Sequence, residues 1–280
     1  GGSSLTMKHS TVNGAMNGPA IDIRDRSIVN IVDCRLMRCQ DGISAQSKAV
    51  VLCSASEISD NIGCGFIGQS ASGKIKETTI QRNASYGVQL LENQDGNDND
   101  VTMTISSSRV CNNGRTGIVL SNSNAILKKN HIHHNANVGL EIEGANSRSQ
   151  VLENQINHNG ESGMLLLQVA GPDLKIMKNN VHHNAFAGIE ISCGKGFTLD
   201  IHSLGPVEAK RQLEKMICRC ELIDNKIHDQ EQSGISIEGC LAAPLLKGNE
   251  VSFNNFANLE FRHLAHPVVK QNHIHHSKQH

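Results

Sequence analysis

The stretch NHIHHNANVG, from Asn130 to Gly139, decides the fold because versions of it return along the chain. It recurs as NQINHNGESG at Asn154–Gly163, as NNVHHNAFAG at Asn179–Gly188 and as NKIHDQEQSG at Asn225–Gly234. After each copy come two apolar residues separated by one variable residue. Looser copies on both sides bring the total to about eleven, and self-similarity of this kind is the mark of a repeat protein.

The clean copies follow one another at intervals of 22 to 25 residues, with one longer gap. They contain short stretches of alternating apolar and polar residues and no periodic run long enough for a helix. A leucine-rich repeat has a similar period but needs an L-x-x-L-x-L frame that is missing here. Three short strands joined by tight turns fit the spacing better. The sequence therefore predicts an all-β chain, a single right-handed parallel β-helix of about 10 to 11 coils, each stacked about 4.8 Å from the next.

Each frame position has a predicted physical role. The aliphatic position should form one inward column, made of Ile132, Ile156, Val181, Ile227, Val251 and Ile274. The first Asn position should form a ladder of side-chain amides between coils, made of Asn130, Asn154, Asn179, Asn225, Asn249 and Asn272. The glycine position should supply a turn conformation that a Cβ would resist, at Gly139, Gly163, Gly188 and Gly234.

Two insertions interrupt the period, at residues 92–100 and 194–217. Within the second, the segment Pro206–Met216 starts with a proline suited to a first helical turn and places Val207 and Leu213 near one face. We expect a short amphipathic helix there. Insertions in repeat proteins often map to a binding face.

Composition narrows the class of protein. The chain has 280 residues, 38% of them hydrophobic, and a formal net charge of −1 without a sustained basic run, which argues against nucleic-acid binding. No stretch of about eighteen or more apolar residues occurs, so no membrane-spanning helix is expected. Nine scattered cysteines favour a reduced, intracellular setting, cytoplasmic or nuclear.

The two ends carry expectations of their own. Residues 1–4, Gly-Gly-Ser-Ser, look like a remnant of an expression tag, which leaves residues 5–280 as the β-helix domain. The sequence stops at His280, part-way through a coil. Because an uncapped coil would expose strand edges, we expect a fragment of a longer protein, with further chain or a partner covering this end.

The His-rich form N-x-[IV]-H-H-N, at Asn130–Asn135, at Asn179–Asn184 and, closed by Ser277, from Asn272, resembles the repeats of F-box-only proteins and of Shc-binding spindle proteins. The resemblance covers nearly the whole chain at the level of the repeat. The first likeness implies the substrate-recognition domain of a ubiquitin ligase, although these residues contain no F-box. The second implies a spindle or cytoskeletal scaffold.

The fold also resembles that of pectate lyases, polygalacturonases and alginate epimerases, so an enzyme acting on uronic-acid polymers is the alternative. Such chemistry needs a base and either carboxylates or a cation gathered in one groove. Asp95, Asp98 and Asp100 are weak candidates for a calcium site, but they fit any solvated turn equally well. Glu141 and Glu190 should lie about 10 Å apart, slightly too far for an inverting glycosidase pair.

Histidines also recur at two adjacent frame positions. Stacked imidazoles could bind a metal or sense pH, but zinc needs ligands that converge, and repeat drift explains the pattern equally well. We therefore expect no metal and no cofactor.

From the residues we expect a non-catalytic protein-interaction module whose partners the sequence does not identify, with a purely structural spacer as a third possibility. A mixed acidic and apolar outer face favours protein recognition. The predicted contact residues are Val119, Glu141, Leu165, Leu167 and Glu190 on the outward strands, and Pro206 and Leu213 in the second insertion.

Overall fold

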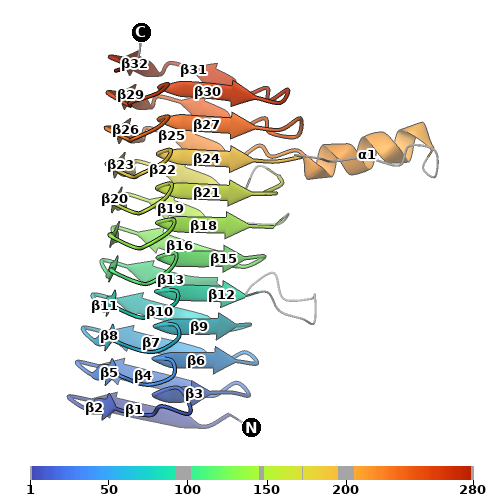
Figure 1. Cartoon of the computed structure of the whole chain (residues 1–280). Coiled ribbons are helices and arrows are strands. Elements are labelled where there is room, and N and C mark those ends of the chain that lie inside the picture. The colour runs from blue at the N-terminus through green and yellow to red at the C-terminus, as the bar shows by residue number, and fades with distance from the viewer. Residues whose placement is uncertain (1, 92–101, 145–147, 172, 195–204, 279–280) are drawn as a thin grey trace.

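The computed structural model describes residues 2–91, 102–144, 148–171, 173–194 and 205–278, which form a right-handed parallel β-helix (Figure 1). Each coil except the last gives one strand to each of three sheets, and every strand pairs in parallel with its counterparts in the neighbouring coils. The last coil gives a strand to the first two sheets. The predicted fold class is confirmed.

The first sheet has eleven strands and the second has eleven. The first sheet contains β1 (Ser4–Lys8), β4 (Ile28–Val32), β7 (Val50–Ser54), β10 (Ser72–Lys76), β13 (Thr102–Ser106), β16 (Asn124–Lys128), β19 (Gln150–Leu152), β22 (Lys175–Met177), β25 (Glu221–Ile223), β28 (Leu245–Lys247) and β31 (Val268–Lys270). The second contains β2 (Thr11–Asn13), β5 (Arg35–Met37), β8 (Glu57–Ser59), β11 (Thr79–Gln81), β14 (Arg109–Cys111), β17 (His131–His133), β20 (Gln155–Asn157), β23 (Asn180–His182), β26 (Lys226–His228), β29 (Glu250–Ser252) and β32 (His273–His275).

The third sheet has ten strands, each of which follows the second-sheet strand of the same coil. They are β3 (Ile21–Ile23), β6 (Ile43–Gln46), β9 (Phe66–Gln69), β12 (Val88–Leu91), β15 (Ile118–Ser121), β18 (Leu140–Glu143), β21 (Met164–Leu167), β24 (Ile189–Ser192), β27 (Ile235–Glu238) and β30 (Leu259–Arg262). The first strand, β1, begins at Ser4, one residue before the domain start expected from the sequence.

The core is a set of aliphatic columns inside the three sheets. In the second sheet the predicted inward column is confirmed from Ile132 to Val251, all of whose members are fully buried. Ile274 continues the column but is 43% exposed, because it belongs to the last coil. The expected cover at this end remains a prediction.

The predicted asparagine ladder is confirmed, and each of its side chains supplies hydrogen-bond partners for polar groups in the turns. Asn130 donates its backbone N–H and its Nδ2 to Oδ1 of Asn154, at 2.9 and 3.1 Å, and Nδ2 also donates to the Ile105 carbonyl. The sequence showed one ladder, whereas the structure has two. The second follows the next turn, through Asn61, Asn83, Asn113, Asn135, Asn159, Asn184, Gln230 and Asn254.

The frame glycines have a different role from the one predicted. Gly139 has no left-handed backbone, but a Cβ there would lie 2.7 Å from both the Gly163 carbonyl oxygen and Cγ2 of Ile156. Close packing between coils therefore requires the glycine. The left-handed turn position belongs to non-glycine residues instead, among them His134 and His158, each with φ of 53°.

The second insertion contains the predicted helix, α1 (Pro206–Met216), which projects from the side of the solenoid (Figure 1). Ala209 is buried and Leu213 packs against the core, whereas Val207 is 82% exposed. Residues 92–101 of the first insertion lie outside the described residues. In the described part of the chain, no helix has the length and apolar character needed to cross a bilayer.

Candidate functional site

The outer face of the third sheet gathers the acidic side chains that the repeat leaves pointing away from the core. Two columns form this face, since alternate residues of a strand point outward. One holds Gln89, Val119, Glu141, Leu165, Glu190, Ser236 and Glu260, and the other holds Leu91, Ser121, Glu143, Leu167, Ser192, Glu238 and Arg262. We call this surface the acidic face.

The acidic face brings together five of the predicted contact residues. Val119, Glu141, Leu165 and Glu190 occupy one column and Leu167 the next. Val119 is only 5% exposed, so it offers little surface to a ligand. The two predicted residues of the insertion, Pro206 and Leu213, belong to α1 and are not on these columns.

Three glutamates of the acidic face are held from the neighbouring coil by a hydroxyl group. Each hydroxyl lies in the turn just before a third-sheet strand and donates to a carboxylate oxygen on the strand above. The pairs are Thr116 Oγ1 to Glu141 Oε2 at 3.4 Å, Ser162 Oγ to Glu190 Oε2 at 2.9 Å and Ser233 Oγ to Glu260 Oε2 at 2.8 Å. The repeat thus orients one carboxylate in each of these coils.

The surroundings of Glu141 raise the pKa of its carboxyl group. Burial is the largest cause, and the negative charge of Glu143 adds to it, while the hydrogen bond from Thr116 acts in the opposite direction. Glu141 is half-buried and Glu143 is exposed. When two neighbouring carboxyl groups lie in different environments, their pKa values can differ, so that one can act as a proton donor and the other as a carboxylate base.

The sequence pointed to Glu141 but missed Glu143. Both lie on β18 and point outward, because they are two residues apart on one strand. The column itself relates Glu141 only to residues of other coils, such as Glu190 two coils away. The Glu-Ile-Glu pattern inside β18 was the available clue, since period-two spacing places both side chains on one face.

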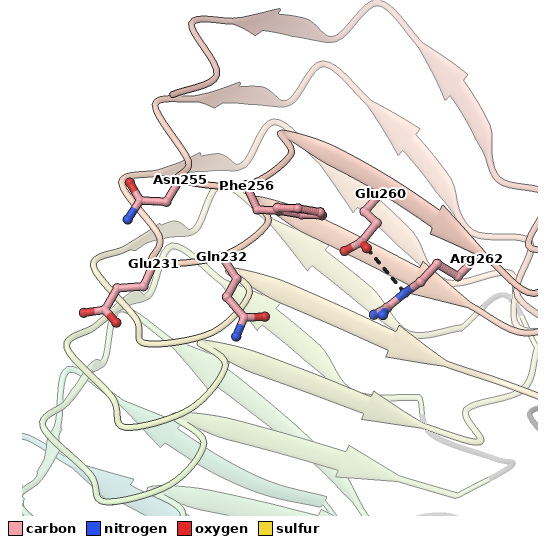
Figure 2. Close-up of a pocket in the computed structure, with 6 residues that line it drawn as sticks. All are labelled: Glu231, Gln232, Asn255, Phe256, Glu260 and Arg262. Carbon is pink, nitrogen blue, oxygen red and sulfur yellow. Dashed lines mark ion pairs between the residues drawn. The ribbon is translucent and has the colours of Figure 1, made fainter. Parts of the chain in front are cut away.

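A shallow depression of about 530 Å³ lies at the C-terminal end of the acidic face (Figure 2). It is lined by Glu231, Gln232, Asn255, Phe256, Glu260 and Arg262. Arg262 Nε lies 3.5 Å from Oε1 of Glu260, and its Nη2 donates to the Ser236 hydroxyl at 3.1 Å. Figure 2 shows the Phe256 side chain extending from its turn toward Glu260. The depression thus combines one aromatic ring with acidic, basic and amide side chains.

The histidines form a separate cluster on the second sheet. The rings of His134 and His158 stack at 5.0 Å, and those of His182 and His228 at 5.2 Å. Burial is the main cause that lowers the pKa values of His133 and His182 to about 4. His133 and His182 are therefore largely neutral near pH 7.

Metal binding finds no support within the residues that the structure describes. There, no three His, Cys, Asp or Glu side chains converge in a way that could hold an ion. The weak calcium candidates Asp95, Asp98 and Asp100 fall among residues 92–101, outside that part of the chain.

The family model for the right-handed β-helix region matches residues 1–124 and 97–202. Solved structures share the fold at low sequence identity. The periplasmic alginate epimerase AlgG is 13% identical, with a TM-score of 0.67 over 90% of this chain and 61% of its own. The A-module of the Azotobacter vinelandii mannuronan C-5 epimerase AlgE6 is 13% identical, with a TM-score of 0.65 over 98% of this chain and 79% of its own.

A third similar structure is the catalytic domain of a GH87 α-1,3-glucanase, 9% identical, with a TM-score of 0.51 over 96% of this chain and 64% of its own. This chain spans about three fifths of the length of AlgG. No curated protein matches the sequence.

These matches correct the functional prediction. The expected non-catalytic protein-interaction module is wrong, because the proteins that share this solenoid across most of the chain are carbohydrate-active enzymes. Neither the family model nor these structures support the finer resemblance to F-box-only or Shc-binding proteins. The repeat itself was read correctly, and the family match extends over well more than half of the sequence. The chain belongs to the right-handed β-helix family.

Proposed function

We propose that this chain is the β-helix of a carbohydrate-active enzyme that acts on an extended polysaccharide at the acidic face. The fold supports this proposal, since the alginate and mannuronan epimerases and the α-1,3-glucanase are built on it. Fold alone does not specify chemistry, so the argument depends on the side chains of the face.

The observation that carries the proposal is the Glu141–Glu143 pair on β18. Residues two apart on a strand are about 7 Å apart, and side chains leaving in parallel keep a similar separation. Inverting glycosidases hold their two carboxyl groups about 6.5–9.5 Å apart, with room for a water molecule.

The two carboxyls would then have distinct roles. Glu141, whose pKa is raised mainly by burial, donates a proton to the glycosidic oxygen as the bond to the anomeric carbon breaks. The Glu143 carboxylate accepts a proton from the water that attacks the anomeric carbon. The products are two shorter glycans, one with a new reducing end.

Charge favours a neutral polysaccharide as the substrate. Besides Glu141 and Glu143, the same outer columns carry Glu190 and Glu260, while Glu238 is buried and contacts His263. Arg262 is the one basic residue of these columns and is paired with Glu260. A polyuronate would meet repulsion along this surface.

One specific contact favours uronate chemistry as a second candidate. The Arg115 guanidinium lies 5.7 Å from the centre of the Tyr86 ring, and Nη1 donates to the Tyr86 hydroxyl at 3.5 Å. Arg115 directly precedes Thr116, which contacts Glu141. An arginine and a phenol beside a carboxyl could neutralise a uronate and exchange its C5 proton, as an epimerase or lyase requires.

Incubation of the protein with neutral glucans and with alginate tests both candidates. Hydrolysis would release reducing ends from a glucan, whereas uronate chemistry would give unsaturated ends or inverted C5 protons in the NMR spectrum of alginate. We expect reducing ends from a neutral glucan. If no glucan and no alginate is altered over a broad pH range, the proposal of an enzyme is rejected.

A further inference from the structure

A row of turns between the second and third sheets carries exposed or half-buried side chains in a regular order. It consists of the third turn residue in six successive coils, Arg115, Asn137, Glu161, Phe186, Gln232 and Phe256, which we call the turn ridge. Backbone N–H groups join it from coil to coil, as in Phe186 to the Glu161 carbonyl at 3.3 Å and Phe256 to the Gln232 carbonyl at 3.1 Å. The ridge therefore runs parallel to the solenoid axis, beside the acidic face.

Two phenylalanines stand out on this ridge. Phe186 and Phe256 are 44% and 50% exposed, although the protein has only six phenylalanines and no tryptophan. They are two coils apart, which corresponds to about 10 Å at the strand spacing. Gln232 lies between them in the coil that separates them, and its side chain is exposed.

We infer that an extended, neutral polysaccharide binds along the turn ridge, with sugar rings stacked on Phe186 and Phe256 and hydroxyls bonded to Gln232 and Glu161. The inference rests on the proposed function and deepens it by naming the surface that holds the polysaccharide and the direction in which it runs. About 10 Å is comparable to a disaccharide repeat in an extended glycan, so the two rings would contact the polymer at every second sugar.

The position of the ridge connects it to the carboxyl pair. Glu141 lies on β18, and Phe186 and Phe256 immediately precede β24 and β30, two and four coils further along the stack. A polymer on the ridge would therefore pass the Glu141–Glu143 pair near one end and the depression of Figure 2 near the other. Long glycans would gain contacts that short ones cannot make.

A peptide or a polyanion fits the ridge less well. An extended peptide needs unpaired backbone groups, but the ridge N–H groups of Glu161, Phe186 and Gln232 already donate to the coil before them. A polyanion would meet one cation, Arg115, at the start of the ridge, but from there on it would face Glu161 and the carboxylates of the acidic face. Aromatic faces and side-chain amides remain, and these suit the C–H faces and hydroxyls of a neutral sugar.

Titration calorimetry on the full chain tests the inference. The titrated protein would carry Glu141→Gln, so that bound glycan is not consumed. The probes are neutral glucan oligosaccharides of increasing length, α-1,3-linked and β-1,4-linked, with alginate oligosaccharides for comparison. We expect affinity to rise with length for one neutral series, and Phe186→Ala or Phe256→Ala to weaken the long ligands about tenfold each.

Phe253→Ala is the matched control, since Phe253 is 41% exposed but follows the second sheet, where it stacks on His276. This control should keep full affinity, and Phe256→Tyr should restore it. Equal binding by the ridge variants and the control, no binding of any neutral oligosaccharide, or tighter binding of alginate would each overturn the inference. If the protein with an intact Glu141 cleaves a glycan equally well with and without the ridge variants, the inference is overturned and the proposed function stands. If binding depends on the ridge but that protein cleaves no glycan, the inference stands and the proposed function is overturned.

Discussion

The Thr116 hydroxyl oxygen lies 3.4 Å from Oε2 of Glu141, across one step of the coil stack. Ser162 and Glu190 repeat the relationship further along the solenoid at 2.9 Å. The hydroxyl favours the charged carboxylate, but at Glu141 burial and the charge of Glu143 outweigh it. The same repeat that builds the fold thus sets the protonation of the proposed acid.

Replacement of Thr116 by alanine should raise the pKa of Glu141 further. The change removes the hydrogen bond that lowers this pKa and leaves burial and the Glu143 charge in place. The carboxyl carbon of Glu141, followed by NMR as pH increases, should titrate later than in the wild type. Thr116→Ser keeps the hydroxyl and should titrate like the wild type, whereas an earlier titration in the alanine variant would refute this account.

Loss of one ladder side chain should destabilise the whole stack. Asn154 is 1% exposed, accepts from the backbone N–H and Nδ2 of Asn130, and donates Nδ2 to the Leu127 carbonyl. Asn154→Ala leaves these buried groups without partners, so the free energy of unfolding should fall by about 2–4 kcal/mol. Denaturant unfolding measures this, with the exposed Asn255→Ala as a control that should change little.

A methyl group at the frame glycine should also be costly. The Cβ of Gly139→Ala would lie 2.7 Å from the Gly163 carbonyl oxygen and from Ile156, so coils must separate, and we expect a loss of about 2–4 kcal/mol. Gly205→Ala, where nothing lies within 4 Å of the new Cβ, is the matched substitution. Equal melting temperatures for the two variants would show that close approach does not explain the glycine.

Acid should weaken the fold through the histidine cluster. Arg109 Nε donates to Nε2 of His133 at 3.0 Å, a contact that requires a neutral imidazole. The folded pKa values of His133 and His182 are about 4, below the ordinary pKa of histidine. Below that ordinary pKa, these two side chains therefore take up protons more readily in the unfolded chain than in the folded one. Stability is therefore full above about pH 6.5 and falls as pH drops toward 4, by about 1.4 kcal/mol for each unit of pKa difference.

Denaturation midpoints at about pH 7 and about pH 4.5 check this dependence. His182→Gln should flatten it. His9→Gln should not, because His9 is exposed and pairs with Asp33 at the surface. A midpoint that rises on acidification would contradict the assignment.

The sequence predicted the solenoid well because burial repeats with the coil. Ile132, Ile156 and Val181 occupy equivalent inward positions, so each copy reports the same constraint. The ladder followed for the same reason. The role of Gly139 could not be predicted in this way. A close approach between coils and a left-handed turn both favour glycine, so the sequence does not distinguish the two roles.

The proposed functional surface was harder to predict because the core does not constrain outward positions. Glu141 was chosen from its column, but its partner Glu143 is on the same strand and carries no repeat signature. Phe186 and Phe256 occupy one ridge position that is otherwise polar, so no repeated aromatic position marks them in the sequence. Placement in space, not composition, identifies these residues.

The most direct test of the proposed acid role of Glu141 measures the release of reducing ends from the glucan that the protein cleaves. It compares the wild type with Glu141→Gln and Glu190→Gln. Glu190 is the matched control, as it belongs to the same column and accepts a comparable hydrogen bond from Ser162. The proposed acid role predicts a loss of about a hundredfold or more for Glu141→Gln and little change for Glu190→Gln. Wild-type rates in Glu141→Gln, or no cleavage of any polysaccharide by the wild type, would contradict it.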